Sequence, residues 1–122
     1  MGNETIVGKR ILLVDDEGAV RESVRTLLAR DEHIVVEANN GAEAYGLFAQ
    51  GRFDLVVTDC VMPFLSGDEL AVRIKRLAPQ QPILMMTGYG YGYRPGPGNP
   101  FDAVLHKPFN YEHLRQEMAK LF

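Results

Sequence analysis

The sequence is poor in cysteine, in long apolar segments and in net charge. With a single cysteine, Cys60, among 122 residues, the chain can form neither an internal disulfide nor a cysteine-based zinc cluster. Its apolar runs fall well short of the about 20 residues that a bilayer span needs, and no signal peptide heads the chain. We therefore expect a cytoplasmic protein without membrane insertion. The formal net charge of −3 argues against direct nucleic-acid binding.

What the sequence does have is the length and composition of one globular domain. It holds 122 residues, of which 46% are hydrophobic and 24% charged, and this size is typical of a single core. Residues 1–8 lack periodicity and are expected to form a flexible lead-in, so the domain is predicted to span 9–122. From this length we expect one domain and no second, effector domain within these residues.

Short apolar runs alternate with segments of helical periodicity. The runs predict strands at residues 10–14, 34–37, 54–58, 82–86 and 103–105. Helices are predicted from Gly18, after the capping-box sequences that begin at Asn40 and Ser66, and from Asn110. Because the strands are apolar throughout and alternate with helices, the pattern indicates an α/β fold with a parallel sheet covered on both faces.

The connection between the fourth and fifth predicted strands has an unusual composition. Many of the 12 glycines and 7 prolines of the chain lie between Gly88 and Pro100. Each glycine costs about 1 kcal/mol in a helix interior, and each proline about 3 kcal/mol. The helix expected there is therefore predicted to be absent or much shortened.

Polar residues whose side chains can bind a ligand or take part in catalysis follow the ends of the predicted strands. They are Asp15, Asp16, Asp59, Thr87 and Lys107. Ligands of open α/β sheets bind at this carboxyl edge, beside the point where the strand order reverses. If the strand order is 2-1-3-4-5, Asp16 and Asp59 lie side by side.

These residue types favour a metal-assisted phosphoryl site. Carboxylates about 5 Å apart repel by roughly 3 kcal/mol per pair at an effective dielectric constant near 20, so such a cluster takes up protons or binds a cation. Oxygen ligands without imidazole or thiolate favour Mg²⁺. A lysine and a hydroxyl on neighbouring strands complete a phosphoryl-binding set. Asp59, between them, is the best-placed nucleophile.

Together these segments resemble the receiver domain of two-component response regulators, which has a flavodoxin-like five-stranded parallel sheet of order 2-1-3-4-5. The resemblance spans residues 10–122. The segments that carry it are VDDE at 14–17, DLVVTD followed by MP at 54–63, SG at 66–67, MTG at 86–88 and KPF at 107–109.

The resemblance implies a role for each site residue. Asp59 is expected to accept a phosphoryl group from the phosphohistidine of a histidine kinase or a histidine phosphotransfer protein. Mg²⁺ is expected to bind Asp16, Asp59 and the carbonyl of Val61, with Asp15 acting mainly through water. Thr87 is expected to bond the phosphoryl group and to shift on activation.

Lys107 is expected to pair with a phosphoryl oxygen, and the Lys107–Pro108 peptide bond to be cis, as in the family. By this resemblance the domain assists its own phosphorylation and dephosphorylation and switches partner binding, without being a turnover enzyme.

The sequence also departs from the family pattern. Val104 stands where relatives often have a switching tyrosine or phenylalanine. Tyr89 could lie over the site, and with Val61 at its rim it is expected to slow the attack of water on the acyl phosphate. The missing fourth helix alters a face that many relatives use to dimerise, so that mode of output does not transfer to this chain.

Three alternatives to a phosphorylatable receiver are considered. An aspartyl-nucleophile phosphohydrolase or mutase needs a second acid two residues after the nucleophile, where this chain has Val61. A flavodoxin-like cofactor binder needs a phosphate loop after the first strand. A degenerate receiver would have lost some of the site residues, but this chain retains all five of them: Asp15, Asp16, Asp59, Thr87 and Lys107. The chain is also compatible with a receiver module of a hybrid sensor histidine kinase or a stand-alone regulator.

Overall fold

The computed structural model describes residues 5–88 and 98–122. The elements are β1 (Arg10–Val14), α1 (Gly18–Ala29), β2 (Ile34–Ala38), α2 (Gly41–Gln50), β3 (Leu55–Asp59), α3 (Gly67–Leu77), β4 (Ile83–Thr87), β5 (Ala103–His106) and α4 (Tyr111–Ala119). The five strands form one sheet of order β2-β1-β3-β4-β5, and every pair is parallel. The predicted fold class is therefore confirmed.

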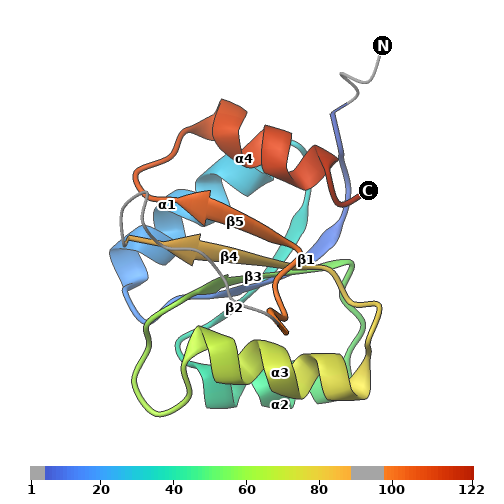
Figure 1. The fold of residues 1–122 in the computed structure, drawn as a ribbon. Coiled ribbons are helices and arrows are strands. Elements are labelled where there is room, and N and C mark those ends of the chain that lie inside the picture. The colour runs from blue at the N-terminus through green and yellow to red at the C-terminus, as the bar shows by residue number, and fades with distance from the viewer. Residues whose placement is uncertain (1–4, 89–97) are drawn as a thin grey trace.

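Helices cover both faces of the sheet (Figure 1). Alternate strand residues point to opposite faces, so Ile11 and Leu13 pack with the cluster that includes Leu28 of α1 and Leu114 of α4. Leu12 instead packs with the cluster formed by α2 and α3 on the other face. The inner strands β1, β3 and β4 are rich in apolar residues because their side chains are buried on both faces of the sheet.

The central strands and the edge strands differ in burial. All residues of β3 and β4 are buried, whereas β2 and β5 at the sheet edges are only half-buried. Strands β2 to β5 also extend past the predicted strands by one residue at their carboxyl ends, because the ladder continues as far as Asp59 and Thr87. The functional side chains therefore stand at or just beyond the last ladder positions.

Side chains cap three of the four helices that lie in residues 5–88 and 98–122, among them the two for which the sequence predicts a capping box. The Asn40 side chain accepts a hydrogen bond from the Glu43 backbone N–H, and Ser66 accepts one from Glu69. Asn110 caps α4 in the same way. Each cap satisfies a backbone donor that the first helical turn leaves without a partner.

Between β4 and β5 the described residues, Gly88 and 98–102, form no helix. Residues 89–97, on which the predicted loss of the fourth helix mainly falls, lie outside the described residues, and so does Tyr89. In the part of the chain that the structure describes, no helix has the length and apolarity to cross a bilayer.

Candidate functional site: an acidic pocket at the carboxyl edge of the sheet

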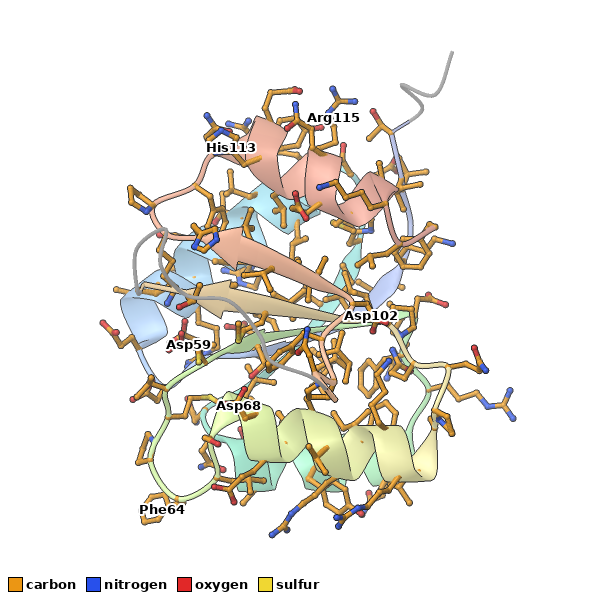
Figure 2. The ribbon with its side chains drawn as sticks, in the orientation of Figure 1. Asp59, Phe64, Asp68, Asp102, His113 and Arg115 are labelled. Carbon is orange, nitrogen blue, oxygen red and sulfur yellow. The ribbon has the colours of Figure 1, made fainter. Side chains whose placement is uncertain are left out.

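Parallel pairing brings the predicted site residues to one edge of the sheet. Val14 pairs with Thr58, so the residues that follow, Asp15 and Asp59, lie on neighbouring strands. Thr87 ends β4, and its partner His106 directly precedes Lys107. In Figure 2 Asp59 lies at this end of the sheet, where the strand arrows point. The expected juxtaposition follows from strand order and register alone.

Three carboxylates meet in this pocket. One oxygen each of Asp15, Asp16 and Asp59 lies within 4.8 Å of the others. Asp15 is fully buried and Asp59 is nearly so, while Asp16 is exposed. At such separations the three negative charges repel strongly. The cluster therefore has a high affinity for positive charge.

Backbone and arginine contacts hold Asp15 in place. The Glu17 backbone N–H donates to Asp15 Oδ1 over 2.9 Å, and Arg21 Nη1 donates to the Asp15 carbonyl over 2.8 Å. Burial raises the pKa of the Asp15 carboxyl above its ordinary value of 3.8; the charge of Asp59 adds to this rise, while the Glu17 bond and Lys107 oppose it. The ionised form of Asp15 is therefore unfavourable in this environment, and a bound cation would stabilise it.

Lys107 supplies a positive charge inside the pocket. Its Nζ lies 3.2 Å from Asp59 Oδ1 and 3.5 Å from Asp15 Oδ2. Partial burial lowers the pKa of the Lys107 ammonium, but the charges of Asp15 and Asp59 outweigh burial, so the pKa lies above its ordinary value of 10.5. Lys107 is therefore a permanent cation that faces the carboxylate of Asp59.

The carboxylate of Asp59 is oriented from two sides. Its Oδ1 accepts a hydrogen bond from the Cys60 backbone N–H over 2.9 Å, in addition to the contact with Lys107. Thr87 is fully buried at the end of β4, and its carbonyl accepts the Lys107 backbone N–H over 2.8 Å. A backbone hydrogen bond at the carboxyl end of β4 and β5 thus fixes Thr87 and Lys107 relative to each other.

The pocket is open to solvent on one side. Its volume is about 430 Å³, and it is lined by Asp16, Glu17, Asp59, Cys60, Val61, Gly88 and Lys107. The Val61 side chain is 55% exposed at this rim. A small molecule or a group of a larger one can therefore approach Asp59 from this side.

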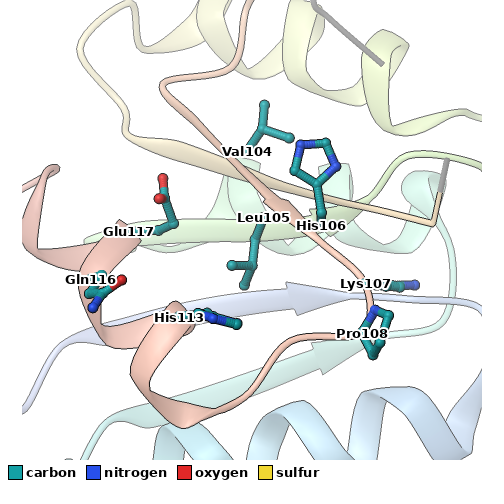
Figure 3. A pocket seen from close by; sticks show the side chains of 8 residues that line it. All are labelled: Val104, Leu105, His106, Lys107, Pro108, His113, Gln116 and Glu117. Carbon is teal, nitrogen blue, oxygen red and sulfur yellow. The ribbon is translucent and has the colours of Figure 1, made fainter. Parts of the chain in front are cut away.

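A second hollow lies between β5 and α4 (Figure 3). It has a volume of about 470 Å³ and includes His106, His113 and Glu117 in its lining. In Figure 3 the two histidine rings point in different directions, and the Lys107 side chain extends away from the other lining residues. The two histidines therefore do not form a common ligand set. The candidate site remains the pocket with the carboxylate cluster.

The structure brings together the residues that the sequence singles out. Asp15, Asp16, Asp59 and Lys107 form one cluster, Thr87 ends the neighbouring strand and the Lys107–Pro108 bond is cis. Sequence reasoning missed Arg21, which positions Asp15 through a backbone carbonyl. An arginine in a helix is common, and no sequence signal distinguishes Arg21 from the other arginines.

A flavodoxin-like sheet that ends in three carboxylates, a lysine and a threonine defines the class of phosphoacceptor receiver domains. The comparisons agree: a sequence model of the response regulator receiver domain matches residues 11–119. The response regulator receiver protein CpdR of Brucella abortus (strain 2308) is 36% identical over 115 residues, covering 93% of this chain and 96% of CpdR. The chain therefore belongs to the response regulator receiver domain family and is a module of two-component signalling.

Two further relatives extend the comparison. The response regulator MprA of Mycobacterium sp. (strain KMS) is 39% identical over 114 residues, which cover 92% of this chain and 50% of MprA. The chain thus spans half the length of that relative. TrrA of Thermotoga maritima, solved in complex with Mg²⁺-BeF, superposes with a TM-score of 0.86 at 34% identity, covering 93% of this chain and 99% of TrrA. TrrA has also been solved in complex with the histidine kinase ThkA, with a TM-score of 0.85, 34% identity and coverage of 93% of this chain and 98% of TrrA.

Proposed function

We propose that Asp59 accepts a phosphoryl group from the phosphohistidine of a histidine kinase or a histidine phosphotransfer protein, and that the acyl phosphate changes the affinity of the domain for a downstream protein. The observation that carries this proposal is the placement of Asp59 between a lysine at 3.2 Å and two further carboxylates. The TrrA–ThkA complex supports a kinase as the partner.

The donor set of the pocket fits Mg²⁺. Three carboxylate oxygens within 4.8 Å of one another offer a hard cation the oxygen ligands that it prefers. We assign Asp16, Asp59 and the Val61 carbonyl as direct ligands, with Asp15 acting mainly through water. When bound, Mg²⁺ would neutralise the charge that gathers on the phosphoryl oxygens. The Mg²⁺-BeF complex of TrrA supports Mg²⁺ as the cation.

The chain's own residues perform the transfer. A carboxylate oxygen of Asp59 attacks the phosphorus, a new P–O bond forms, and the P–N bond breaks. The electron pair of the broken bond stays on the imidazole nitrogen of the donor, which then takes up a proton from water. Lys107 pairs with one phosphoryl oxygen and the Thr87 hydroxyl donates a hydrogen bond to another. Thr87 shifts when it bonds the phosphoryl group, and this shift signals that the domain is phosphorylated.

The pocket favours a signalling module over a turnover phosphohydrolase. An aspartyl phosphohydrolase uses a second acid two residues after its nucleophile as general acid and base, and this position holds Val61, whose apolar side chain lies at the pocket rim. Water near the acyl phosphate then lacks a general base on this loop. We therefore propose that the domain assists only its own phosphorylation and dephosphorylation, as part of a cytoplasmic pathway.

The domain spanning 9–122 would signal by contact with another chain or with a further segment of its own protein. MprA, about twice as long as the matching region, shows that the family includes longer proteins. The output of this chain is therefore expected to be set by its partners.

Incubation with Mg²⁺ and acetyl phosphate, read by intact-protein mass spectrometry, tests this function. The parent should gain the mass of one phosphoryl group, and Asp59→Asn should gain none. Asp68→Asn, which removes an exposed carboxylate from the first turn of α3, serves as the matched control and should behave like the parent. Equal labelling of the parent and Asp59→Asn would overturn the proposal.

A further inference from the structure

The loop between β3 and α3, residues 60–66, presents two apolar side chains beside the acidic pocket. Phe64 is 93% exposed and Val61 is 55% exposed, whereas Met62 and Leu65 of the same loop are buried. Met62 and Leu65 therefore pack the loop against the core, while Val61 and Phe64 are exposed to solvent. An aromatic side chain left in water forgoes the free energy that its burial provides, so the exposure of Phe64 is unfavourable for the isolated domain.

The backbone at Phe64 adds a second cost. Its φ is +71°, and the Leu65 N–H donates to the Pro63 carbonyl over 2.9 Å. Phe64 is thus the middle residue of a γ-turn with positive φ, a strained conformation that is rare for a bulky side chain. Glycine would adopt this conformation without the cost. Folding stability therefore does not explain a phenylalanine at this position, and strain of this kind points to function.

The base of the loop is held firmly enough to present Phe64 in one place. The Gly67 N–H donates to the Cys60 carbonyl over 2.9 Å, and Gly67 packs so closely on the Asp59 carbonyl that no side chain fits between them. Val61 lines the pocket that contains Asp59. Phe64 extends outward from the same loop, away from the body of the molecule (Figure 2).

We propose that Phe64 and Val61 form an apolar docking ridge for the protein that donates the phosphoryl group, an inference that rests on the proposed function. A donor protein has to cover the pocket mouth, and with it Val61, before its phosphohistidine reaches Asp59. The three carboxylates oppose the attraction of the negative phosphoryl group to Lys107 and to a bound cation. Contacts outside the pocket would therefore add to donor affinity, and an apolar patch beside the donor's histidine would bury the ridge.

The proposal predicts that the ridge serves protein donors and not small ones. The probe is the autophosphorylated histidine kinase or phosphotransfer protein, among those purified from the source organism, that transfers fastest to the parent. With this donor, Phe64→Gly should raise the half-saturating donor concentration about ten- to hundredfold, with little change in the maximal rate. With Mg²⁺ and acetyl phosphate, Phe64→Gly should be labelled at the parent's rate. Its melting temperature should equal or exceed that of the parent, so a folding defect cannot mimic the effect.

A matched control separates the ridge from surface apolarity in general. Leu77 is 54% exposed at the far end of α3, and Leu77→Ala should transfer as the parent does. The proposal is overturned if Phe64→Gly and the parent transfer alike from the protein donor, if Leu77→Ala loses as much, or if only acetyl phosphate labels the parent. A loss of equal size with acetyl phosphate would also overturn it, because Phe64 would then act on the chemistry. If acetyl phosphate does not label the parent at all, it is the proposed function that fails.

Discussion

Asp102 and Asp59 lie at opposite ends of the same sheet (Figure 2), in contrasting electrostatic surroundings. At the amino-terminal edge, Asp102 Oδ2 accepts the Ile83 N–H and pairs with Lys75, each over 2.8 Å. Lys75 also donates to the Gln81 carbonyl over 2.7 Å. At the carboxyl edge, by contrast, Asp59 shares Lys107 with Asp15 and stands against Asp16 as well.

The contrast separates stability from function within one domain. The amino-terminal edge matches acceptors to donors, which stabilises the start of β4 and β5. The carboxyl edge holds unbalanced charge in a pocket that is open to solvent on one side, which should destabilise the free domain and favour the binding of a cation. Substitutions at the two edges should therefore differ in the sign of their effect on stability.

The largest effect is expected at Gly67, where the backbone itself leaves no space. A Cβ at Gly67 would collide with the Asp59 carbonyl, so Gly67→Ala should lower the free energy of unfolding by about 3 kcal/mol. It should also slow labelling by acetyl phosphate, because Asp59 has to move.

Gly46 is exposed in α2, and a Cβ added there would meet no atom within 4 Å. It is the control: Gly46→Ala should stabilise by about 0.5–1 kcal/mol. Urea unfolding measures both.

The next effect is expected at the amino-terminal edge. Asp102→Ala leaves the N–H of buried Ile83 and the Lys75 ammonium without this acceptor, so it should cost about 2 kcal/mol of stability. Asp102→Asn keeps an oxygen for the Ile83 N–H and should cost roughly half as much. Neither variant should change labelling by acetyl phosphate. A stability gain in Asp102→Ala would contradict the contrast between the edges.

At the carboxyl edge the sign should reverse. Asp15→Asn removes one of the repelling charges while its side-chain oxygen can still accept the Glu17 N–H. In magnesium-free buffer it should therefore raise the free energy of unfolding by about 1–2 kcal/mol. Added Mg²⁺ should stabilise the parent more than the variant, because binding to the folded state adds to stability. Loss of stability in magnesium-free buffer would show that charge repulsion is not the dominant cost here.

Sequence patterns predict the architecture and the site better than they predict the loop and the packing of single polar side chains. Apolar runs mark the strands, and parallel strands necessarily bring their carboxyl ends together, so Asp15, Asp59 and Lys107 could be placed in one pocket. The γ-turn at Phe64 could not be predicted, because its backbone angle depends on the buried Met62 and Leu65 that hold the loop. His33 is buried, and no sequence pattern distinguishes it from an exposed histidine.

The smallest effect concerns His33, near the amino-terminal edge. Its Nδ1 accepts the Lys9 N–H over 2.9 Å, which requires a neutral ring. Burial lowers the pKa of His33 below its ordinary value of 6.5; the charge of Lys9 adds to this and that of Asp31 opposes it. Below pH 6.5 the unfolded chain therefore binds a proton more readily than the folded chain, so stability falls as the pH falls toward the folded-state pKa.

His33→Asn keeps an acceptor for the Lys9 N–H and removes the titration. The parent should therefore lose stability between pH 7 and pH 5 more steeply than the variant, by at most about 1.4 kcal/mol per pH unit. Urea unfolding at a series of pH values measures the difference. His113 is exposed on α4, and His113→Asn should retain the parent's slope. If His33→Asn retained that slope as well, the burial of His33 would not be the source of the pH dependence.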